Sequence, residues 1–123
     1  MNDSDQGPSL CPTDRCALVL EPTGTYLEWA RRCPEGDADL SLEELRAEGT
    51  VYLIPEIEGW PETWLRHNYS ALFEHELAAW CMDDSLRPLN RSFGSFKKFF
   101  EIRFCSVVLD MVRRAIRKEK TGE

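Results

Sequence analysis

A carboxylate set among apolar side chains is the first feature of this sequence that could do chemistry. Glu76 lies beside Leu72, Phe73 and Leu77 in a run with helical spacing. A lone carboxylate is costly to bury, so it must be paired, hydrogen-bonded or protonated. We expect Arg91, which follows a loop, to reach back as a bidentate partner. The pair is either a polar clasp that holds the loop or a functional carboxylate acting as general base or ligand.

Asp110 could join Glu76 and Arg91 in a small site, and Asp83 and Asp84 are further oxygen donors. Hard cations need several oxygen ligands, but these residues do not have the spacing of a calcium-binding loop. Asp84 also fits an ordinary turn or cap. The sequence therefore predicts no metal and no cofactor, and its candidate catalytic residues are Glu76, Arg91 and Asp110.

Other catalytic arrangements are missing from the sequence. His67 and His75 are eight residues apart, whereas zinc-binding pairs on a helix are four apart. Cys81 and His75 would lie about 120° apart around a helix axis, which does not suit a nucleophile pair. The chain has no Gly-x-Ser-x-Gly elbow, no Gly-rich phosphate loop and no dinucleotide fingerprint.

Two groups of residues could instead bind a partner. Trp60 and Trp64 lie at the start of the apolar run that predicts a long helix, but they lie outside the apolar face of that helix. If both are exposed they form an aromatic patch of the kind that anchors partners; the alternative is packing within the fold. The basic end of the chain, with Arg113, Arg114 and Arg117, is either a solvated segment or a docking segment for an acidic partner.

Charge is distributed unevenly along the 123 residues. Residues 1–62 hold 14 acidic and 4 basic residues, a net charge of −10, whereas residues 63–123 hold 8 and 11, a net charge of +3. The acidic half argues against nucleic-acid binding, which depends on clustered positive charge. The N-terminus lacks a signal-peptide pattern, and no apolar run reaches the roughly 20 residues that cross a membrane. We expect a cytoplasmic protein whose five cysteines are reduced.

The chain has the length of one domain with its own core. Residues 1–15 are polar and have no apolar period, so they predict a flexible N-terminal tail. Residues 16–111 form a single predicted domain. Residues 112–123 form a basic C-terminal helix or tail.

The apolar pattern predicts a small α+β domain. Short β-branched runs predict strands at about 16–21 and 50–57, and a helical stripe predicts a long helix at about 61–80. The run at 100–109 fits strand and helix spacing; we favour the strand because β-branched residues are frequent there. A three-stranded sheet with helices packed on one face follows. Strand order cannot be read from the pattern.

Three polar residues predict helix starts. Thr25 with Glu28 and Ser41 with Glu44 have the spacing of capping boxes, in which a hydroxyl and a carboxylate exchange hydrogen bonds with the first turn. Ser92 is the expected cap of a short aromatic helix.

A scattered pattern of residues suggests a family relationship. It consists of Leu53-Ile54-Pro55-Glu56, Phe73 with Glu74, Glu76-Leu77 with Trp80, Asp84-Ser85, Pro88, Arg91, Phe100-Glu101, Ser106 and Asp110. This pattern resembles a family of short, functionally uncharacterised bacterial proteins. The chain departs from it at Arg87 and Phe99, where Trp is expected, and at Cys105, where His is expected. The resemblance implies a bacterial cytosolic protein and carries no known activity.

Two classes of function remain. We favour a small interaction or accessory module without catalytic activity, which binds a protein partner or forms a homodimer through the tryptophans or the basic end. The alternative is a small enzyme or a ligand- or metal-binding protein built on Glu76, Arg91 and Asp110. Neither class involves a membrane or nucleic acid.

Overall fold

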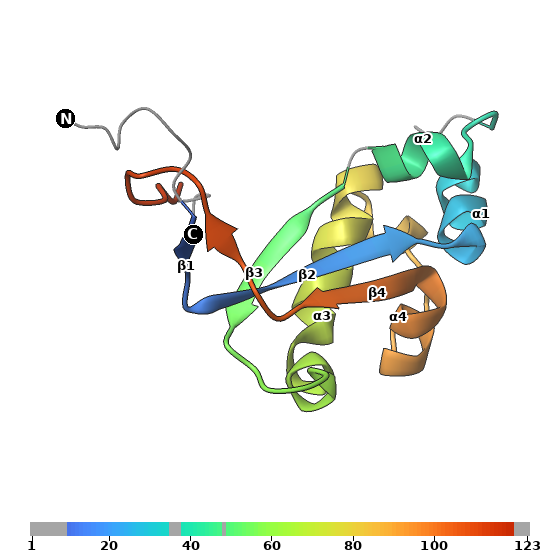
Figure 1. The fold of residues 1–123 in the computed structure, drawn as a ribbon. Helices are drawn as coiled ribbons and strands as arrows, with labels where there is room; N and C mark the ends of the chain where they lie inside the picture. Colours follow the sequence, from blue (N-terminus) through green and yellow to red (C-terminus); the bar gives the residue numbers. More distant parts are fainter. Residues whose placement is uncertain (1–9, 35–37, 48, 120–123) are drawn as a thin grey trace.

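The computed structural model describes residues 10–34, 38–47 and 49–119 (Figure 1). It has the α+β fold that the sequence predicts, with a three-stranded sheet and a long helix. In chain order the elements are β1 (Cys11–Pro12), β2 (Arg15–Pro22), α1 (Gly24–Arg32), α2 (Leu42–Ala47), β3 (Val51–Pro55), α3 (Glu62–Trp80), η2 (Asp84–Leu86), α4 (Phe93–Phe99), β4 (Phe100–Cys105) and β5 (Leu109–Asp110).

The main sheet is antiparallel and has the order β3-β2-β4. In the central strand β2, Cys16, Leu18 and Leu20 are buried, whereas the residues between them are half-buried. This alternation arises because successive side chains of a strand point to opposite faces. One face of the sheet therefore packs on the core, and the other remains open.

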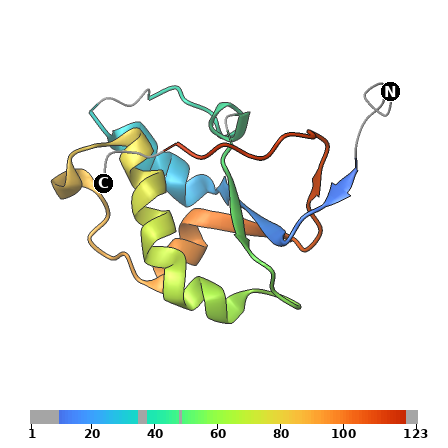
Figure 2. The same cartoon turned by 90° about the vertical axis from the view of Figure 1, so that its left-hand side faces the viewer.

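The helices cover the buried face of the sheet (Figure 2). Helix α3 is continuous, which confirms the predicted helix at about 61–80, and Phe73 and Leu77 on its stripe are fully buried. The ring of Phe73 lies 5.5 Å from that of Phe96 and 5.3 Å from that of Phe99. These edge-to-face contacts join α3 to α4, and α4 leads directly into β4.

The run at 100–109 is a strand rather than a helix, but it ends earlier than predicted. β4 pairs with β2 as far as Cys105. Beyond it, both the backbone N–H and the hydroxyl of Thr13 donate hydrogen bonds to the carbonyl of Val108, at 3.1 Å and 3.0 Å. The chain then continues into β5, which pairs with β1 in a separate two-stranded ribbon.

The predicted domain boundaries need correction at both ends. β1 and the start of β2 lie within residues 1–15, so the predicted tail is too long; residues 1–9 lie outside the described residues. Residues 111–119 contain no helix, so the helical alternative for residues 112–123 is wrong over that part, and residues 120–123 lie outside the described residues.

Two of the three predicted helix caps are confirmed. Ser41 and Glu44 exchange the hydrogen bonds of a capping box, at 3.0 Å and 3.1 Å. Ser92 caps α4 by accepting from the N–H of Ser95. The predicted box at Thr25 is wrong, because the N-cap of α1 is Thr23, two residues earlier. Within the described ranges, no helix combines the length and the apolar character needed to span a membrane.

Candidate functional site

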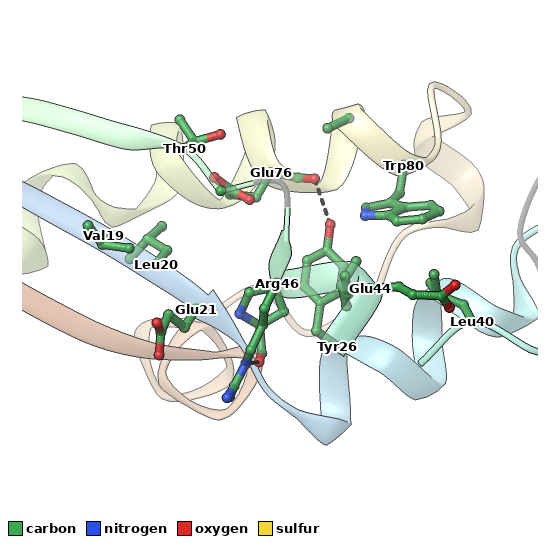
Figure 3. Close-up of a pocket in the computed structure, with 14 residues that line it drawn as sticks. Val19, Leu20, Glu21, Tyr26, Leu40, Glu44, Arg46, Thr50, Glu76 and Trp80 are labelled. Atoms are coloured by element: carbon green, nitrogen blue, oxygen red, sulfur yellow. Dashed lines mark hydrogen bonds between the residues drawn. The ribbon is translucent and has the colours of Figure 1, made fainter. Parts of the chain in front are cut away.

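A cavity of about 630 Å³ opens between the end of β2, helix α2 and helix α3 (Figure 3). This volume lies in the range of small-molecule binding sites. We call it the Glu76 cavity. Its lining residues are Val19, Leu20, Glu21, Pro22, Tyr26, Leu40, Glu44, Leu45, Arg46, Gly49, Thr50, Glu76, Ala79 and Trp80.

Glu76 enters the cavity from α3 and is held by two tyrosines. The Tyr52 hydroxyl donates a hydrogen bond to Oε2 of Glu76 at 2.5 Å, and the Tyr26 hydroxyl donates to the backbone carbonyl of Glu76 at 2.9 Å. Burial raises the pKa of Glu76, whereas the Tyr52 hydrogen bond and the charge of His75 act in the opposite direction. The carboxyl group is thus positioned firmly and ionises less readily than an exposed glutamate.

Tyr52 links this carboxylate to the protein surface. Its hydroxyl oxygen also lies 3.0 Å from Nδ1 of His75, which is exposed. Burial and the hydrogen bond to Glu76 raise the pKa of Tyr52, so the phenol stays protonated. Because its one proton is donated to Glu76, Tyr52 must accept from an Nδ1–H of His75. Sequence reasoning missed Tyr52, although strand alternation places it on the same face as the buried Ile54.

Arg91 is not the partner of Glu76. Its Nη1 lies 3.1 Å from Oε2 of Glu74 and 3.0 Å from Oδ1 of Asp84. Residues two apart on a helix point about 200° apart, so Glu74 and Glu76 face different surroundings. The hydrogen bond from Arg91 lowers the pKa of Asp84. The predicted Glu76–Arg91 pair is therefore wrong, and the clasp that holds the segment after α3 is built on Glu74 instead.

Arg87 is the second cation of this clasp, and sequence reasoning did not identify it as a site residue. Its side chain is only 11% exposed. It donates to Glu74 at 3.1 Å, to the carbonyl of Cys81 at 3.1 Å and to the carbonyl of Met82 at 3.2 Å. Arg87 thus fixes the segment after α3 against the helix. The interactions of both arginines are those of a structural clasp.

Asp110 lies in the ribbon, at β5, away from the other two candidate catalytic residues. Its Oδ1 accepts a hydrogen bond from the N–H of Val112 at 2.8 Å. The Glu76 cavity includes neither Arg91 nor Asp110 among its lining residues. The described structure therefore does not bring the three predicted residues together: Glu76 lines this cavity, and Asp110 lines a separate hollow beside the ribbon.

The two candidate tryptophans have different environments. Trp60 is 52% exposed, and its ring makes an edge contact with Phe104 at 6.1 Å. Trp64 is half-buried and packs against the core. The predicted patch is thus reduced to one exposed indole at the start of α3. The basic residues Arg114 and Arg117 are exposed within the irregular segment 111–119.

A second hollow, of about 450 Å³, lies where the open face of the sheet meets the ribbon. We call it the ribbon groove. Leu53 contributes from β3, Leu109 from β5, and Ile116 and Lys118 from the C-terminal segment. The charged residues of the lining are mixed: Arg15 and Lys118 are basic, and Asp14 and Asp110 are acidic. Arg15 pairs with Asp14 at 2.7 Å.

Among the described side chains, no three His, Cys, Asp or Glu residues are arranged to hold a metal ion. All five cysteines are described, and none is in a disulfide. The chain matches no protein-family model, no curated protein and no solved structure.

Proposed function

We propose that this protein is an interaction module that binds another protein through the ribbon groove and the adjoining open face of the sheet. The observation that carries the proposal is the group of exposed apolar side chains at this place. Val51 is 61% exposed and Leu53 46% exposed on β3, and Leu109 and Ile116 are exposed beside them. Clustered apolar exposure of this kind is typical of docking surfaces.

The charge around the groove supports a partner with acidic residues. Residues 109–119 contain four basic residues (Arg113, Arg114, Arg117 and Lys118) against Asp110 and Glu119, a net charge of +2. The partner segment that suits this surface has apolar side chains for the groove and carboxylates for its basic rim. The resemblance to short bacterial proteins and a cytoplasmic location remain part of the same proposal.

A site-specific photo-crosslinker tests this proposal. Leu53 is replaced by a photoreactive phenylalanine in cells that express the protein, and the matched control carries the same group at Ser70, which is exposed on α3. We expect one dominant adduct from position 53, and little from position 70. An adduct of twice the chain mass identifies the partner as a second copy.

Charge reversal at Arg114 and Arg117 then tests the basic rim. Because electrostatic attraction between exposed groups is screened by salt, we expect the adduct yield to fall in the variant and to fall in the parent as ionic strength rises. Equal adduct yields from positions 53 and 70 would contradict the proposal. An adduct yield that changes neither with charge reversal nor with ionic strength would contradict it as well.

A further inference from the structure

The Glu76 cavity has the features of a second binding site, separate from the ribbon groove. The cavity joins elements distant in sequence: β2, α1, α2 and α3 all contribute to its walls. Figure 3 shows Glu76 and Trp80 on one side of it and Glu21 and Arg46 on the other. Its volume of about 630 Å³ is sufficient for a small organic molecule.

Glu76 is the polar anchor of this cavity. Its Oε2 accepts from Tyr52, and among the described residues Oε1 has no hydrogen-bond donor. No Lys or Arg side chain of the described chain bonds to it; the nearby basic side chain is His75, on the outer side of Tyr52. A half-buried carboxylate with one unused oxygen is stabilised by a ligand that brings a positive charge and N–H donors.

The wall beside Glu76 suits the apolar part of such a ligand. Trp80 follows Glu76 by four residues on α3, so the two side chains are neighbours on one helix face. Leu20 and Leu45 add aliphatic surface to the cavity. An indole next to a carboxylate favours cations, because the ring face attracts positive charge as well as apolar groups.

The one arginine in the lining is already engaged elsewhere. Nε of Arg46 donates to the carbonyl of Pro22 at 2.8 Å, and its Nη2 lies 4.0 Å from the carboxylate of Glu101. In Figure 3 its guanidinium points away from Glu76. Arg46 therefore neither neutralises Glu76 nor offers an anion site at that end of the cavity.

We infer that the Glu76 cavity binds a small organic ammonium ion, with the charged head at Oε1 of Glu76 and the apolar arm against Trp80. An anionic ligand is disfavoured, because Glu21 and Glu44 also line the cavity. The ammonium must meet an ionised Glu76, and burial raises the pKa of that carboxyl. Affinity should therefore increase with pH as Glu76 ionises.

Nuclear magnetic resonance titration with n-butylammonium chloride tests the inference. We expect saturable shifts of the amide signals of Thr50, Ala79 and Trp80 in the intact protein. Glu76→Gln keeps an oxygen acceptor for Tyr52 but removes the charge, so we expect binding to weaken by about tenfold or more. The matched control Glu43→Gln removes one exposed charge from α2 outside the cavity and should leave the affinity unchanged.

Sodium butyrate has the same apolar arm with the opposite charge, and we expect it to produce no saturable shift. Three results would overturn the inference: no saturation with butylammonium, equal binding by butyrate, or equal affinity of E76Q and the parent. The pH dependence in the parent protein provides a further check that needs no variant. If no ammonium ion binds in the Glu76 cavity, the proposal for the ribbon groove still stands, because the two surfaces share no lining residue.

Discussion

Removal of Arg87 should weaken the fold more than removal of Arg91, although both arginines bind Glu74. The Arg87 side chain is 11% exposed and that of Arg91 is 26% exposed. Arg87 also donates to the carbonyls of Cys81 and Met82, whereas the bonds of Arg91 run to carboxylates. Arg87→Ala therefore removes one of the two cations that bind Glu74 and leaves two carbonyls without their donor.

The size of the effect follows from these contacts. A hydrogen bond that involves a charged group contributes about 1.5–3 kcal/mol, and surface ion pairs contribute about 0–1 kcal/mol. Water can replace part of what Arg87 supplies, because Met82 is exposed. We expect Arg87→Ala to cost about 2 kcal/mol of unfolding free energy. With a urea dependence of about 1–3 kcal/mol per molar, the midpoint should fall by about 1 M.

Urea unfolding, followed by tryptophan fluorescence and circular dichroism, measures this difference. Arg91→Ala is the matched control and should shift the midpoint less. Arg87→Lys should recover only part of the loss, because one ammonium cannot serve Glu74 and both carbonyls in the geometry of the planar guanidinium. A larger loss from Arg91→Ala, or full recovery with lysine, would refute the role assigned to Arg87.

Three further changes test other parts of the structure. Phe73→Ala removes a fully buried ring and should cost about 3–5 kcal/mol in urea unfolding, whereas the half-buried Leu72→Ala should cost clearly less. Because burial raises the pKa of Glu76, this carboxyl destabilises the fold as pH rises through its folded pKa. The urea midpoint of Glu76→Gln should thus equal that of the parent protein at acid pH and exceed it at neutral pH. A midpoint below that of the parent at neutral pH would contradict this reasoning. Ser41→Ala removes half of the capping box of α2 and should cost about 1 kcal/mol, while exposed Ser70→Ala should not.

Local patterns in the sequence were sufficient for the main elements. The spacing of Leu65, Phe73 and Leu77 predicts a helix because 3.6 residues per turn places them on one side, and all three are buried. Ser41 and Glu44 predict a helix start because their reach is set by the first turn alone. Alternation also identified β4, but not its end, because the Thr13–Val108 contacts that redirect the chain join distant segments.

The candidate site depends on pairings between side chains that local sequence patterns do not predict. The sequence identified Glu76 as an unusual carboxylate and predicted Arg91 as its partner. It could not decide which side of α3 the segment after the helix would follow, and that path placed Arg91 on Glu74.

The sequence by itself determined the α+β class and the long helix, since these depend on periodicity within one segment, and it favoured a strand over a helix for residues 100–105. Only the tertiary structure decided the pairing of Tyr52 with Glu76, the separation of Asp110 and the existence of the Glu76 cavity. Each of these depends on how β2, β3 and the helices are stacked. Such contacts form between residues far apart in the chain, and no local spacing specifies them.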